Sequence, residues 1–148
     1  MENTTTVSKE TINDLIKINN DRIVGYQKAI EELKDSHDAD LKTLFTDIIH
    51  QSERFKNELQ SFEENTVDDE TTMSGKLYRG WMDIKAVFTG HDRKTILSNC
   101  EGGEDAAKKA YQEALSEDLP TDIKEVIFEQ QSEQLKVHNK IKSLRDSE

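Results

Sequence analysis

The fold is decided by residues 8–33, which read SKETINDLIKINNDRIVGYQKAIEEL. Positions at alternating intervals of four and three residues are apolar with a single exception, Asn19: Ile12, Ile16, Asn19, Ile23, Tyr26, Ile30 and Leu33. An average spacing of about 3.5 residues places them on one side of an α-helix that packs along a near-parallel or antiparallel neighbour. Strands alternate every second residue, and the sequence lacks that pattern. The stretch therefore predicts a helix over about residues 8–35.

The same spacing returns three more times along the chain. It joins Leu41, Phe45, Ile48, Ser52, Phe55, Leu59 and Phe62; then Ile96, Cys100, Gly103, Ala107, Ala110 and Ala114; then Ile123, Ile127, Gln130, Gln134, Val137, Ile141 and Leu144. We expect helices over about residues 38–64, 92–116 and 119–146, and a shorter amphipathic helix over about 74–89. Residues 1–148 then form a single domain.

Helix lengths and connections predict how these elements are arranged. The first two long helices and the last two are joined by short connections, which favour antiparallel hairpins. The shorter 74–89 helix, with the polar loop before it, is suited to carry the chain from one end of the bundle to the other. We therefore expect an all-α, ferritin-like antiparallel four-helix bundle with two hairpins joined by a crossover. A five-helix bundle in which residues 74–89 are a full member is the alternative.

Composition excludes several classes of protein. One cysteine cannot build a disulfide framework or a cysteine-rich metal site. A net charge of −11 argues against binding to nucleic acid, and no apolar run is long enough to span a membrane. The first residues lack the pattern of a signal peptide. We expect an acidic, cytoplasmic protein with no nucleic-acid partner and no membrane insertion.

Several motifs follow one another along the chain: INNDRIVGY at 18–26, WMDIK at 81–85, TGHD at 89–92, CEGGEDAA at 100–107, Tyr111, DLP at 118–120 and LRD at 144–146. In this order they resemble a bacterial family of ferritin-like four-helix-bundle proteins of unknown function. The similarity extends over nearly the whole chain. It implies a ferritin-like fold, and the family supplies no established activity and no catalytic residues to carry over.

The resemblance raises the question of a metal site. Ferritin-like enzymes hold two iron or manganese ions at mid-bundle with Glu residues and Glu-x-x-His pairs. The predicted helix at 119–146 contains no such pair, and the second helix offers Asp47-x-x-His50 and His50-x-x-Glu53. At about 100° per residue His50 lies opposite the apolar side of its helix, and the same arithmetic turns Asp21 and Glu31 outward. We therefore expect no standard two-metal site and predict no cofactor.

Polar residues nevertheless interrupt the apolar sides near mid-bundle: Asn19, Ser52, Gln130 and Gln134, with Glu104 beside them. The predicted topology places Asn19 near the level of Gln130, and Glu104 near Gln130 and Gln134. One explanation is a hydrogen-bonded network that fixes helix register, as a buried Asn does in coiled coils. The other is a small-ligand or metal site centred on Glu104, with Asn19, Gln130, Gln134 and His138 as its other candidate ligands. His138 is alternatively a half-buried histidine with one hydrogen-bond partner.

Three functions follow from these patterns. The favoured one is a non-enzymatic bundle protein that acts by association with itself or with another protein. Val24, Ile49, Val126 and Phe128 extend the apolar faces beyond one side per helix, which suggests a homodimer. The alternative is a ferritin-like oxidase or stress protein that binds iron or manganese through an unusual, degenerate site. Iron storage ranks last, because no oxidation centre is visible in the sequence.

Overall fold

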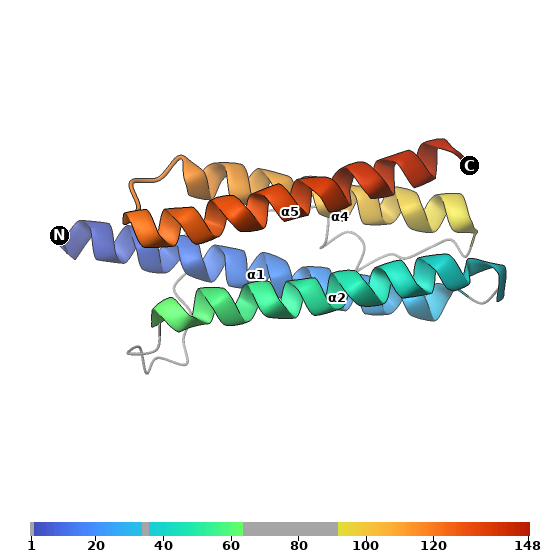
Figure 1. Cartoon of the computed structure of the whole chain (residues 1–148), viewed down its shortest axis with the longest axis horizontal. Helices are drawn as coiled ribbons and strands as arrows, with labels where there is room; N and C mark the ends of the chain where they lie inside the picture. The colour runs from blue at the N-terminus through green and yellow to red at the C-terminus, as the bar shows by residue number, and fades with distance from the viewer. Residues whose placement is uncertain (1, 34–35, 64–91) are drawn as a thin grey trace.

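The computed structural model describes residues 2–33, 36–63 and 92–148, and every element in those ranges is helical. Four long helices lie along a common axis: α1 (Glu2–Glu32), α2 (Ala39–Gln60), α4 (Arg93–Leu115) and α5 (Thr121–Asp146). Two single turns of 3₁₀-helix, η1 (Ser36–Asp38) and η2 (Ser61–Glu63), flank α2. The prediction of an all-α four-helix bundle is confirmed at this level (Figure 1).

Neighbouring helices pair in the expected order. α1 packs on α2, α4 packs on α5, and α1 joins the two pairs through α4, whereas α2 and α5 approach each other less closely. α2 and α4 begin at the same end of the bundle and run in the same direction (Figure 1). The predicted helix at 74–89, which includes Trp81, and His91 after it lie outside the described residues.

Arg93 forms ion pairs at the end of the bundle where α2 and α4 begin. Arg93, the first residue of α4, lies 2.7 Å from Asp40 and 3.1 Å from Asp38 at the start of α2, and 3.0 Å from Glu148. The hydrogen bond from Arg93 lowers the pKa of Asp40 to about 2. These contacts fix the starts of two helices and the C-terminus at one level.

The observed helices begin and end within a few residues of the expected positions, with one exception. α1 begins at Glu2, ahead of the predicted start at residue 8. The prediction missed this first part of the helix because the residues before Ser8 show no apolar periodicity. Pro120 is the N-cap of α5, and its carbonyl accepts the Lys124 amide at 2.9 Å. Proline suits this position because its fixed backbone angle and missing N–H cost nothing there.

Buried apolar side chains form one core along the bundle axis. In α2 the buried residues are those of the predicted side: Leu41, Phe45, Ile48, Ser52, Phe55 and Leu59. In α1 the buried face is wider, because this helix packs on both α2 and α4. Leu15, Ile18, Arg22 and Ala29 are buried beside the predicted positions. Within the described ranges, no helix combines the length and apolarity required to cross a membrane.

The wider face of α1 corrects one expectation. Asp21 was expected to point outward, but it is only 5% exposed and accepts a hydrogen bond from Lys17 at 3.0 Å. Glu31 and His50 are exposed as predicted, and Cys100 is buried as predicted.

Candidate functional site

A buried ion pair lies near the middle of the bundle. Arg22 of α1 and Glu104 of α4 are both fully buried. Arg22 Nε donates to Glu104 Oε2 at 3.2 Å, and Nη2 donates to Oε1 at 3.3 Å. The two side chains therefore meet through both carboxylate oxygens. An arginine fork matches a carboxylate in this way, and such two-point contacts fix orientation as well as distance.

Each partner of this ion pair makes further hydrogen bonds. Glu104 also accepts the Tyr26 hydroxyl at 2.6 Å and the Gln134 amide at 3.0 Å. Arg22 also donates to the Gln51 side chain at 3.1 Å. Buried charges are tolerated when they are paired and hydrogen-bonded, and both conditions are met here.

Tyr111 connects the ion pair to the last helix. Its hydroxyl accepts the Asn19 amide at 3.0 Å and donates to Gln130 Oε1 at 2.6 Å. Gln130 in turn donates to the Phe55 carbonyl at 3.2 Å and to Glu58 at 2.9 Å. Hydrogen bonds therefore link all four helices at one level. We call the buried residues of this level the mid-bundle layer: Asn19, Arg22, Tyr26, Glu104, Tyr111, Gln130 and Gln134.

Charge and burial set the ionisation of this layer. Burial has the largest single effect on Arg22 and would lower its pKa, but the charge of Glu104, its hydrogen bond to Arg22 and the neighbouring tyrosines together outweigh burial and raise the pKa. Burial, and next the charge of Glu104, raise the pKa of Tyr26 well above its ordinary value. Burial also raises the pKa of Tyr111. Both tyrosines therefore stay protonated and act as hydrogen-bond donors at neutral pH.

Cys100 lies one helical turn before Glu104 on α4 and is fully buried. Burial, and next the charge of Glu104, raise the pKa of its thiol well above the ordinary value. Because the thiolate is the reactive form, this cysteine is chemically quiet in the folded protein. We predict that a chromogenic disulfide reagent labels Cys100 only as fast as the protein unfolds, and at once in denaturant. Rapid labelling of the folded protein at neutral pH would contradict this placement.

The structure brings together most of the candidate ligands that the sequence indicated. Asn19, Glu104, Gln130 and Gln134 all belong to the mid-bundle layer. Ser52 is buried at the same level but donates to the Ile48 carbonyl of its own helix at 2.9 Å. His138 lies apart from the layer: it is 8% exposed, and its Nε2 is 2.5 Å from Oδ1 of Asp105.

Sequence reasoning missed the central member of the layer, Arg22. It also treated Tyr26 and Tyr111 as packing residues and did not consider their hydroxyls. Arg22 follows Leu15 and Ile18 at intervals of three and four residues, so it lies on the second buried side of α1. That second run of positions is the signal that could have identified it.

The residues of the layer do not fit the two-metal centre of ferritin-like enzymes. Such a centre needs several carboxylates and histidines around one point. Among residues 2–33, 36–63 and 92–148, no group of three or more His, Cys, Asp or Glu side chains is placed to hold a metal ion. Both oxygens of Glu104 are already bonded to Arg22, whose positive charge lies where a cation would have to bind. Gln134 Oε1 is the layer's single buried side-chain oxygen with no partner in the described part of the chain.

One known protein family matches most of the chain. Residues 8–117 match the family described as Domain of unknown function (DUF2383). The chain belongs to this family. The DUF2383 match covers α2, α4 and most of α1, and it ends before α5. Gln130 and Gln134 therefore complete the layer from a helix beyond the matched residues. Comparison with curated proteins finds no match.

Proposed function

We propose that this DUF2383 protein is a non-enzymatic, ferritin-like bundle that acts by binding other protein chains. The ferritin-like arrangement is supported by the two helix pairs and by the common direction of α2 and α4. A simple up-down bundle would make consecutive helices antiparallel throughout. A connection between α2 and α4 that crosses the length of the bundle is therefore part of the proposal.

The Arg22–Glu104 ion pair carries the non-enzymatic part of the proposal. In ferritin-like enzymes the middle of the bundle holds the metal ions that perform the chemistry. Here a guanidinium group supplies the positive charge, and tyrosine and glutamine side chains occupy the remaining hydrogen-bonding positions. The layer is thus suited to fixing the register of four helices, as a buried polar residue does in coiled coils.

The outer surface supports action by association. Two large apolar side chains are exposed among the described residues, Val24 on α1 at 43% and Phe128 on α5 at 59%. Two of the four residues that extend the apolar faces in the sequence, Val24 and Phe128, therefore lie on the surface. Exposed apolar side chains of this size contribute to protein interfaces when they gather with others in a patch.

Metal content distinguishes this proposal from the alternative, an iron- or manganese-dependent oxidase or stress protein. We predict that protein purified without chelator from iron- and manganese-supplemented medium contains far less than one metal ion per chain by elemental analysis. We also expect added Fe²⁺ or Mn²⁺ to leave its melting temperature unchanged. One or two ions per chain that are lost in Glu104→Gln would contradict the proposal. Light scattering on the same sample measures oligomer mass, and a shell of many 17.0 kDa chains would favour iron storage.

A further inference from the structure

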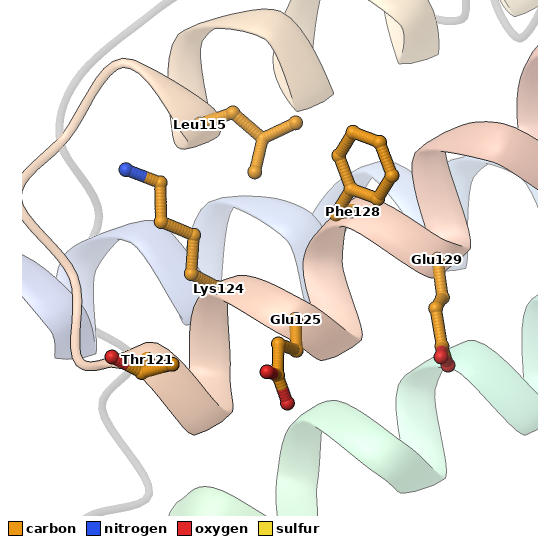
Figure 2. Close-up of a pocket in the computed structure, with 6 residues that line it drawn as sticks. All are labelled: Leu115, Thr121, Lys124, Glu125, Phe128 and Glu129. Carbon is orange, nitrogen blue, oxygen red and sulfur yellow. The ribbon is translucent and has the colours of Figure 1, made fainter.

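The start of α5 and the end of α4 share an open groove on the outside of the bundle. It has a volume of about 800 Å³ and is lined by Leu115, Thr121, Lys124, Glu125, Phe128 and Glu129. Figure 2 shows Leu115 at the end of α4 near Phe128, with the side chains of Glu125 and Glu129 pointing away from Leu115. Phe128 is 59% exposed, more than Val24, the other large apolar side chain that is exposed among the described residues. The groove thus combines an apolar floor with acidic residues along one side.

The charge around this groove is strongly one-sided. Residues 113–133 carry seven acidic side chains and one basic side chain, Lys124, for a net charge of −6. That is more than half of the −11 of the whole chain. Among the described residues, neither Glu125 nor Glu129 makes an ion pair, whereas Glu133 lies 2.5 Å from Arg54. The two groove carboxylates are therefore available to an incoming positive charge.

We propose that this groove binds a basic amphipathic helix of a partner protein. This inference rests on the proposed function and names the surface and the class of partner. An apolar side chain of the partner would cover Phe128, and its lysine or arginine residues would approach Glu125 and Glu129. Helices bind grooves in this way through apolar anchors on one side, with charged residues at the edge. Charges at the edge of an interface mainly set its specificity and association rate.

Charge also argues against other occupants. A second copy of the chain would bring two acidic faces of the same kind together, and an anionic membrane would repel the surface. The DUF2383 match ends at residue 117, so Glu125, Phe128 and Glu129 lie beyond it.

Fluorescence anisotropy with a labelled helical peptide tests the proposal. The probe is an amphipathic peptide of leucine and lysine, and a peptide with glutamate at each lysine position is its counterpart. We expect the full chain to bind the lysine peptide, more weakly as salt rises, and not to bind the glutamate peptide. Phe128→Gln should weaken binding about tenfold, and Glu125→Gln/Glu129→Gln about fivefold.

Two matched variants control for general attraction to an acidic protein. Val24→Gln removes the other large apolar side chain that is exposed among the described residues, which lies on α1 and does not line the groove. Glu31→Gln/Asp47→Asn removes two exposed carboxylates that do not line the groove, one at the end of α1 and one in the first half of α2. Both should bind the lysine peptide as the wild type does. Equal loss in the control and groove variants, or full affinity in Phe128→Gln, would overturn the proposal.

Light scattering separates the remaining occupants. A wild-type dimer that Phe128→Gln converts to monomer would overturn the proposal and assign the groove to a second copy. A monomer that Phe128→Gln strongly destabilises would likewise overturn it and assign the groove to another part of the same chain. Failure of peptide binding in a metal-free protein would leave the proposed function standing, whereas stoichiometric metal would contradict that function whatever the peptide does.

Discussion

Arg22→Met is expected to lower the free energy of unfolding by about 3–5 kcal/mol, because it leaves the Glu104 carboxylate buried without its counter-charge. Methionine retains much of the length and apolar volume of the arginine stem, so the loss reports mainly the charge and its hydrogen bonds. Urea denaturation followed by far-ultraviolet circular dichroism measures it. A loss of this size is a large fraction of the 5–15 kcal/mol that is typical of a small domain.

Arg54→Met is the matched control for this experiment. Arg54 also bonds a glutamate on another helix, Glu133, but its side chain is 49% exposed. Water screens such a pair, and exposed pairs contribute about 0–1 kcal/mol. We therefore expect Arg54→Met to lower stability far less than Arg22→Met. Equal losses from the two substitutions would mean that burial of the Arg22 pair has no special energetic role.

Stability is expected to fall steeply above about pH 10, because two buried tyrosines resist ionisation in the folded protein. The pKa values of Tyr26 and Tyr111 are raised in the fold, so above pH 10 the unfolded chain loses protons that the folded chain retains. The contribution of the two tyrosines to stability is therefore fully present below their pKa in the unfolded chain, and it is lost as the pH rises toward their pKa in the folded protein. Each tyrosine lowers the free energy of unfolding by at most about 1.4 kcal/mol per pH unit.

Tyr26→Phe isolates this effect from the ionisation of lysines in the same range. At neutral pH the variant should be less stable by about 1–3 kcal/mol, because Glu104 loses the hydroxyl donor at 2.6 Å. Above pH 10 the difference between wild type and variant should narrow, since only the wild type has this tyrosine to ionise. Urea denaturation at a series of pH values measures the difference. A difference that stays constant up to pH 11 would contradict the raised pKa of Tyr26.

The sequence predicted the parts of this structure that depend on one neighbour per helix. Spacing of apolar residues identified the buried side of α2 residue by residue, and it placed Gln130 and Gln134 on the inner side of α5. Helix direction then predicted that Asn19 and Gln130 lie at one level, and Tyr111 joins them. These predictions succeed because helical periodicity and chain direction are local properties.

Sequence periodicity did not identify the residue of the mid-bundle layer whose burial depends on a second neighbouring helix. Arg22 is buried between two neighbours of α1, since it donates to Gln51 of α2 and to Glu104 of α4. An arginine on an otherwise polar segment is more often exposed, and composition gives no sign of its buried partner 82 residues away. Periodicity identifies a tyrosine as a packing residue, but it cannot show which atom its hydroxyl contacts.

The central claim, that a charge pair internal to the chain fills the mid-bundle layer, is tested most directly by combining Arg22→Met with Glu104→Leu. Each single substitution leaves one buried charge without a partner, whereas the double variant leaves neither. We expect the double variant to have a higher free energy of unfolding in urea than either single variant. Losses that simply add in the double variant would show that Arg22 and Glu104 are not coupled, and would contradict the account.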